Sequence, residues 1–156
     1  MGWGFLSYAL VAALVLILLS AGIEDARRRE IANWKNTAIA VMAPAWWYLQ
    51  GYGLADAGIQ LGIALVVFAL FVGAFHFGWM GGGDVKMIGA LALWLPMQAL
   101  FFMLMVMSVI GGVLTLIMML DHWRRKVPGA VETPYGVAIA MAAMVALSEP
   151  IFNQFA

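Results

Sequence analysis

Long runs of apolar residues without a single charge dominate this chain of 156 residues. Apolar residues make up 65% of it and charged residues 10%, whereas soluble domains contain about 45–50% and about 25%. A helix that crosses a bilayer needs roughly 20 apolar residues, and several runs approach that length. The composition therefore excludes an ordinary soluble domain and a disordered chain. It predicts an all-α integral membrane protein with a single membrane-embedded domain over residues 1–156.

We expect six transmembrane helices. The apolar stretch from Met87 to Leu120 is too long for one crossing, and Pro96 divides it into a short fourth helix and a long fifth. No Lys or Arg precedes the first apolar run, so it is interpreted as a retained helix and not as a cleaved signal peptide. The predicted helices are Trp3–Ile23, Trp34–Gly51, Gly58–Phe77, Val85–Leu95, Met97–Leu120 and Tyr135–Phe152.

The basic residues predict the orientation, because Lys and Arg gather in cytoplasmic loops. Six spans place all of them on one side and put the N-terminus and the C-terminus on the outer side of the cytoplasmic (inner) membrane. A net charge of zero argues against nucleic acid as a partner, whereas the basic loops are suited to anionic lipids of the inner leaflet. The basic residues are Arg27, Arg28, Arg29, Lys35, Lys86, Arg124, Arg125 and Lys126.

Tryptophans also gather near the predicted helix ends, as in the aromatic belts of membrane proteins. Trp3, Trp46, Trp47 and Trp94 lie near predicted outer ends. Trp34, Trp79 and Trp123 lie near predicted inner ends.

Two aspartates at the predicted inner face are the candidate functional residues. Asp25 follows the first helix and Asp84 follows three glycines before the fourth. Glycines permit positive φ and close backbone approach. When two carboxyl groups share a site, one stays ionised and the other protonated, so the pair can activate water. The alternatives are a solvated boundary for Asp25 and a helix N-cap for Asp84.

At these residues the sequence resembles the type IV prepilin peptidases, membrane aspartic proteases with a GxGD signature. The family's first motif is similar to D-x-R-x-R-x-I-P-N, and Ala32 stands here in place of its proline. Matches to that motif are Asp25, Arg27, Arg29, Ile31 and Asn33. The second motif, G-G-G-D-x-K, is matched by Gly81, Gly82, Gly83, Asp84 and Lys86, and a weaker third match is Pro134, Tyr135 and Gly136.

The resemblance implies an aspartic endopeptidase that removes the short basic leader of prepilins or pseudopilins at the cytoplasmic face. Asp25 and Asp84 would be its catalytic pair, with Gly81, Gly82, Gly83 and Lys86 in the active-site loop. Arg27, Arg29, Asn33 and Tyr135 would support the site or contact substrate. The short chain resembles the form that serves Flp-type pili, or its archaeal preflagellin-processing relatives. Larger members carry Cys-x-x-Cys motifs and methylate the new N-terminus, which is not expected of a chain without cysteine.

Two simpler interpretations and one rival function stay open beside this reading. The arginines serve equally as lipid anchors, and Lys86 either holds Asp84 ionised, contacts a substrate acid or anchors the interface. The rival function is a non-enzymatic membrane carrier or pilus-assembly scaffold that uses the two aspartates as a cation or proton site. No metal or other cofactor is expected, because His76 has no partner at ligand spacing. The oligomeric state and the identity of the pilin do not follow from the sequence.

Overall fold

The computed structural model describes residues 2–126 and 133–148. Within these ranges the chain forms six α-helices and no strand, as expected. The helices are α1 (Gly2–Arg28), α2 (Asn33–Leu49), α3 (Leu54–His76), α4 (Gly82–Ala92), α5 (Met97–Arg125) and α6 (Tyr135–Ser148). α1 and α5 extend further toward their C-termini than predicted. The predicted end of the sixth helix at Phe152 lies outside the described residues.

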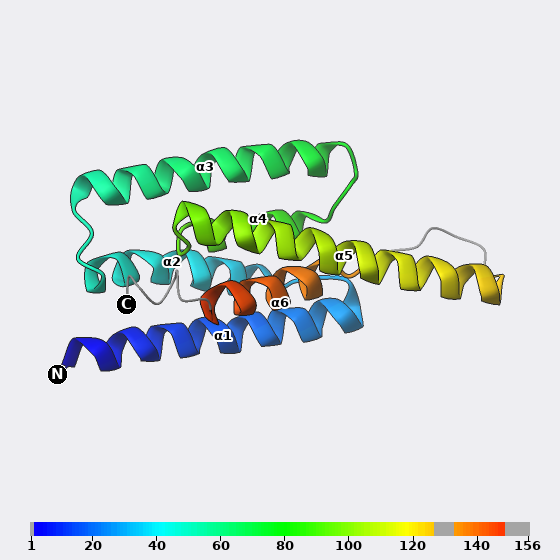
Figure 1. Cartoon of the computed structure of the whole chain (residues 1–156), viewed down its shortest axis with the longest axis horizontal. Helices are drawn as coiled ribbons and strands as arrows, with labels where there is room; N and C mark the ends of the chain where they lie inside the picture. Colours follow the sequence, from blue (N-terminus) through cyan, green and yellow to red (C-terminus); the bar gives the residue numbers. More distant parts are fainter. Residues whose placement is uncertain (1, 127–132, 149–156) are drawn as a thin grey trace.

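The six helices differ in length, and successive helices run in opposite directions (Figure 1). α1, α3 and α5 are long and apolar enough to cross a membrane. α2, α4 and α6 have 17, 11 and 14 described residues, fewer than the roughly 20 of a full crossing. The protein is therefore a membrane protein with three clear candidate spans, and the six-span count and the orientation stay predictions.

The short helices α4 and α6 lie at the centre of the bundle. α4 packs against α2, α3 and α6, and α6 packs against α1, α4 and α5. Most residues of both helices are buried, whereas α3 has only Gln60 and Ala64 buried among its residues. In Figure 1, α3 and α1 accordingly lie on opposite sides of the central pair. Small residues bring the helices close together, since Gly22 of α1 lies against Ala140 of α6.

α4 ends inside the protein, and side chains from its neighbours satisfy its last carbonyls. Pro96 lacks an N–H and stops the helix before α5 begins. The Gln60 side-chain amide donates to the carbonyls of Ala92 and Leu95 at 2.6 and 2.8 Å. The Trp47 indole donates to the Leu93 carbonyl at 2.7 Å. An 11-residue helix spans about 16 Å, roughly half of the hydrocarbon core, and these bonds satisfy the carbonyls where it ends inside the bundle.

Two of the tryptophans near the predicted outer ends, Trp46 and Trp94, do not belong to an aromatic belt. Trp46 and Trp94 are 2% and 1% exposed and stack with ring centroids 5.6 Å apart. The Trp94 indole donates to the Ile39 carbonyl at 2.8 Å. The prediction was wrong for these residues because their rings join α2 to the end of α4. Trp34, Trp79 and Trp123, near the predicted inner ends, are exposed as a belt requires.

Candidate active site

Asp25 lies in the last turn of α1, within the helix and not in the loop after it. Its residue is only 5% exposed. The carboxylate Oδ2 accepts the backbone N–H of Val137 at 3.3 Å, an N–H that also lies 3.2 Å from the Pro134 carbonyl. Val137 belongs to the first turn of α6, where its N–H and the helix dipole stabilise a negative charge. The start of α6 therefore forms an anion-binding surface on which the Asp25 carboxylate rests.

Gly136 makes this contact sterically possible. A Cβ at position 136 would lie 2.8 Å from the Asp25 Cγ and 2.8 Å from the Ile31 Cδ1. Asp25 and Ile31 are both buried, so a side chain at position 136 would require these two side chains or α6 to shift. The glycine of the third motif match thus has a physical reason. A side chain at position 136 would displace the Asp25 carboxyl or α6.

Asp84 lies at the third position of α4 and not at its N-cap, which is Gly81. Its Oδ2 accepts the Gly81 N–H at 3.3 Å, so the carboxylate folds back over the helix start. The residue is 7% exposed, and its Oδ1 is buried without a hydrogen-bond partner in the structure. A buried carboxylate oxygen without a partner is costly, so this oxygen is suited to accept a hydrogen bond from a molecule in the adjoining pocket.

The three glycines before Asp84 serve close packing and not positive φ. Gly81 has a φ of −74°, and the described glycines with positive φ are Gly51 and Gly78. A Cβ on Gly81 would lie 3.1 Å from the Asp84 Oδ2, and one on Gly83 would lie 3.3 Å from the Ile31 Cβ. Gly82 has only an ordinary contact, at 3.5 Å, with Phe75. The glycines therefore let the start of α4 approach both its own carboxylate and the α1–α2 connection.

Asp25 and Asp84 open into one pocket of about 320 Å³ at the end of the bundle where α1 ends and α4 and α6 begin. Opposite directions of successive helices bring these three ends together (Figure 1). Arg27 is exposed and does not line this pocket. The lining residues are Asp25, Arg29, Glu30, Ile31, Asn33, Gly81, Gly82, Gly83 and Asp84.

The two carboxyl groups interact electrostatically. Asp84 lies in the first turn of α4, outside the three candidate spans. Burial, and next the charge on Asp25, raise the pKa of Asp84 to about 6, against the opposing effect of the Gly81 N–H. A carboxyl group with this pKa holds its proton under mildly acidic conditions in which an exposed aspartate is ionised.

Lys86 and Tyr135 do not line the pocket with the aspartates. The Lys86 Nζ donates to the Asn33 Oδ1 at 2.8 Å, and Lys86 faces a different groove, between α2, α3 and α4. The hypothesis that Lys86 holds Asp84 ionised is therefore wrong, since the pKa of Asp84 is raised. Tyr135 packs its ring over Gly111 of α5, where an added Cβ would lie 3.2 Å from the Tyr135 Cε1.

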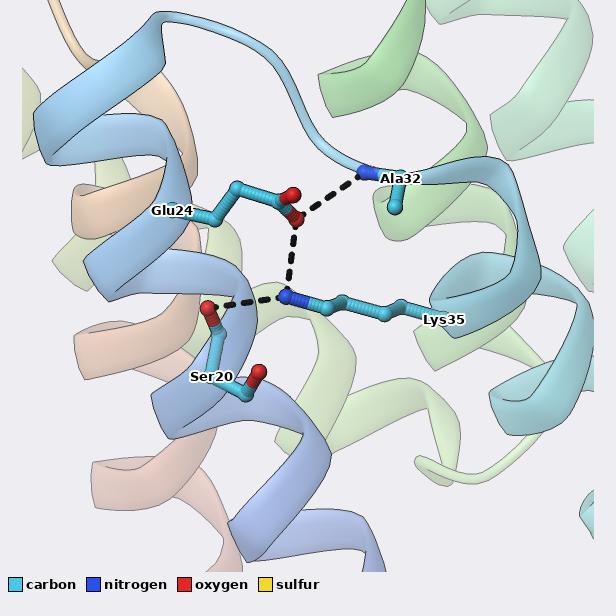
Figure 2. Close-up of polar contacts among 4 residues, drawn as sticks. All are labelled: Ser20, Glu24, Ala32 and Lys35. Atoms are coloured by element: carbon cyan, nitrogen blue, oxygen red, sulfur yellow. Dashed lines mark hydrogen bonds and ion pairs between the residues drawn. The ribbon is translucent and has the colours of Figure 1, made fainter.

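A polar clamp, formed by Glu24 and Lys35 with two backbone groups, fixes the connection between α1 and α2 (Figure 2). The Lys35 Nζ lies 2.7 Å from the Glu24 Oε2 and donates to the Ser20 carbonyl at 3.0 Å. The same Glu24 oxygen accepts the Ala32 N–H at 3.1 Å. Because residues 29–31 between these anchors line the pocket, the clamp holds one of its walls.

Sequence reasoning did not find Glu24, Lys35 or Asn36 as parts of this site. Lys35 looked like one more interfacial cation, yet it is 5% exposed. Asn36 donates to the Gly83 carbonyl at 3.1 Å and so ties α2 to the start of α4. Their spacing in the sequence could have indicated these contacts. Ser20 and Glu24 are one turn apart on α1, and the polar residues 33, 36 and 37 share one side of α2.

The described residues contain no group of three or more His, Asp or Glu that is suited to a metal ion. The chemistry available in the pocket is that of two buried carboxyl groups, and the pKa of Asp84 is raised to about 6. In comparisons with known proteins, a sequence model of the type IV leader peptidase family matches residues 12–116. No curated protein and no solved structure matches the chain significantly.

Proposed function

Since the chain belongs to the type IV leader peptidase family, we propose that it is an aspartic endopeptidase that removes the leader of prepilin-like proteins. The observation that carries this proposal is the shared pocket of Asp25 and Asp84, two buried carboxyl groups from helices far apart in the sequence. Two carboxyl groups of unequal pKa in one pocket can hydrolyse a peptide without a metal or a covalent intermediate.

In the proposed reaction, Asp25 is the general base and Asp84 the general acid. The ionised Asp25 carboxylate, held by the start of α6, takes a proton from water as the water oxygen bonds to the scissile carbonyl carbon. Protonated Asp84 gives its proton to the carbonyl oxygen. As the C–N bond of the resulting gem-diol breaks, Asp25 passes its proton to the leaving nitrogen, and Asp84 recovers a proton from one of the two hydroxyls, whose oxygen becomes the carbonyl oxygen of the new acid. This assignment rests on the raised pKa of Asp84.

We place the reaction at the cytoplasmic face of the inner membrane, where the basic residues near the pocket predict the inner leaflet. Arg27, Arg28 and Arg29 are exposed at the end of α1, beside Asp25. The proposed substrates are prepilins or pseudopilins of the Flp type, whose basic leader would remain on this side. Methylation of the new N-terminus is not part of the proposal, since the Cys-x-x-Cys motifs of the larger family members are missing from this sequence.

The test is cleavage of a co-expressed prepilin by Asp25→Asn and Asp84→Asn variants. Each substitution removes the charge and the acid–base chemistry but keeps an oxygen that accepts a hydrogen bond. We expect each to lower cleavage by at least about 100-fold, with the protein still present in the membrane fraction. Asp56→Asn is the matched control, because Asp56 is exposed at the start of α3 and only accepts the Gly53 N–H. Retained cleavage in both single variants would overturn the proposal and favour the carrier or scaffold function.

A further inference from the structure

Arg29, the residue that directly follows α1, has a left-handed backbone conformation with a φ of 58°. Its N–H donates to the Asp25 carbonyl at 2.9 Å and so closes the last turn of the helix. Glycine is the usual residue in this conformation at a helix end, because a Cβ there comes too close to the following carbonyl oxygen. An arginine costs stability at this position, so the turn alone does not explain why an arginine is present.

The location of Arg29 distinguishes it from the two arginines before it. Arg29 lines the pocket of Asp25 and Asp84, whereas Arg27 and Arg28 do not. Neither of the ion pairs found in the described part of the chain includes Arg29, so no acidic side chain neutralises its charge by direct contact. Among the described residues that line this pocket, Arg29 is the one cation.

The charge of Arg29 acts on one member of the carboxyl pair. The guanidinium interacts electrostatically with the Asp25 carboxylate, whereas the charge that acts on Asp84 is that of Asp25. Backbone N–H groups favour a negative charge on both, since Asp25 and Asp84 each accept such a bond at 3.3 Å. The other charged side chain of the lining is Glu30, an acid, which favours the ionised form of neither aspartate.

This asymmetry determines where a shared proton resides. Two interacting carboxyl groups hold one proton between them over a range of pH. A cation near one of them favours the negative charge at that group and therefore the proton at the other. The preference is stronger for carboxyl groups that are shielded from water, as Asp25 and Asp84 are. A single arginine near Asp25 is thus sufficient to distinguish a base from an acid in this pair.

We propose that Arg29 directs the shared proton of the carboxyl pair to Asp84, so that Asp25 stays ionised as the base of the reaction. Arg29 is a positioning residue in this role, because it acts through Asp25 and not on the substrate. The inference rests on the proposed function and adds the group that divides the acid and base roles. The strained backbone at position 29 is then the cost of keeping a cation at this point of the chain.

Arg29→Gly tests the inference, because its effects on stability and on cleavage are expected to have opposite signs. Glycine relieves the left-handed strain, so the melting temperature in detergent should rise by about 2 °C. Cleavage of a reporter prepilin should have a kcat about 10-fold lower than that of the wild type, because the charge no longer favours the productive arrangement of the proton. KM should stay within about 2-fold of the wild-type value, since Arg29 does not bind the substrate in this proposal.

Lys126 at the end of α5 is the matched control. It is the other described non-glycine residue with a positive φ, of 51°, and it does not line the pocket, since the end of α5 projects beyond the end of α1 (Figure 1). Lys126→Gly should raise the melting temperature as Arg29→Gly does and leave cleavage unchanged. Arg29→Met keeps the backbone strain but not the charge, so it should lower kcat about 10-fold at a constant melting temperature. Arg29→Lys keeps both, and its kcat should stay within about 2-fold of the wild-type value.

The two proposals fail in different ways. Wild-type kcat in Arg29→Gly or Arg29→Met, or a kcat in Arg29→Lys as low as in Arg29→Met, overturns the role of Arg29 and leaves the peptidase proposal intact. A change in KM alone has the same consequence, because Arg29 would then bind the substrate. A lower melting temperature of Arg29→Gly also overturns the inference, because the side chain would then hold the fold. A wild-type protein that cleaves no prepilin overturns the peptidase proposal and, with it, this role of Arg29.

Discussion

At the scale of single residues, Asp25 and Asp84 share a pocket but have different surroundings. Asp25 accepts an N–H from the start of another helix, whereas Asp84 accepts one from its own helix and leaves an oxygen without a partner. The neighbours of the two carboxyl groups therefore differ, and such differences are the general way in which a carboxyl pair can divide the acid and base roles.

The pKa of Asp84 predicts the pH dependence of cleavage. The proposed acid works only while protonated, and its protonated fraction falls as the pH rises through about 6. We therefore expect kcat/KM to fall about tenfold per pH unit above that value. In the substrate complex, exclusion of water raises the pKa of Asp84 further, so the decline of kcat should begin at higher pH.

The measurement is a pair of pH profiles with a reporter prepilin that has no titratable group near the scissile bond. The absence of such groups assigns the decline to the enzyme. A kcat/KM that stays constant between pH 6 and 8 would contradict Asp84 as the acid.

Gly136 gives a second test at this scale. Gly136→Ala places a Cβ 2.8 Å from the Asp25 Cγ, so the carboxyl must move or α6 must shift. Overpacking of this kind costs about 1–3 kcal/mol, and we expect both a lower melting temperature in detergent and a loss of cleavage. The control is Gly112→Ala on α5, where nothing lies within 4 Å. Full cleavage by Gly136→Ala would show that the contact with α6 does not position Asp25.

At the scale of elements, the site is built from helix ends. α1 contributes its last turn, α4 and α6 their first turns, and the connection between α1 and α2 a wall. Helix starts offer free N–H groups to carboxylates, and helix ends allow side chains to reach across to a neighbour. The clamp of Glu24 and Lys35 joins α1 to α2 at this end of the bundle.

The clamp predicts that Glu24→Gln destabilises the protein. The Lys35 side chain is 6% exposed and would keep its charge without a carboxylate to balance it, because the amide oxygen at position 24 and the Ser20 carbonyl are neutral acceptors, which is costly for a buried ammonium. We expect a lower melting temperature and reduced cleavage, because residues 29–31 lose their anchor. Asp121→Asn, which breaks the exposed pair with Arg125, should change neither quantity appreciably.

A double variant separates charge from packing in this clamp. Glu24→Met with Lys35→Met removes both charges and keeps apolar volume, so it should be more stable than Glu24→Gln alone. Equal melting temperatures of the single and double variants would mean that the ion pair does not hold the connection.

The sequence predicted the helix order and the two aspartates, but not the interactions that surround them. Motif spacing indicated Asp25, Asp84 and Gly136, which the structure brings together at one end of the bundle. Motif spacing could not reveal that Lys35 is buried or that Lys86 is not paired with an acid. Both are cations near helix ends, and only packing distinguishes them. The tryptophan prediction failed for Trp46 and Trp94 for the same reason: a ring at a helix end packs equally well against lipid or against another ring.

At the scale of the whole molecule, hydropathy and Pro96 predicted six helices with a short fourth, which the described residues contain. Hydropathy measures apolar length, so it could not tell that α4 and α6 form the centre while α3 packs mainly on α4. The six-span count, the orientation and the single-domain organisation stay predictions. The family match covers residues 12–116 and thus includes both aspartates, whereas the contacts of Asp25 with α6 lie beyond it.

The peripheral place of α3 has a consequence for how the protein meets its substrate. Because α3 packs mainly on α4, we expect the groove between α2, α3 and α4 to open toward the acyl chains when the bundle lies in a bilayer. For a substrate anchored by its own apolar helix, we then expect arrival by diffusion within the plane of the bilayer. The encounter rate of such a pair is set by the number of substrate molecules per unit of membrane area, so the membrane itself acts as the concentrating device.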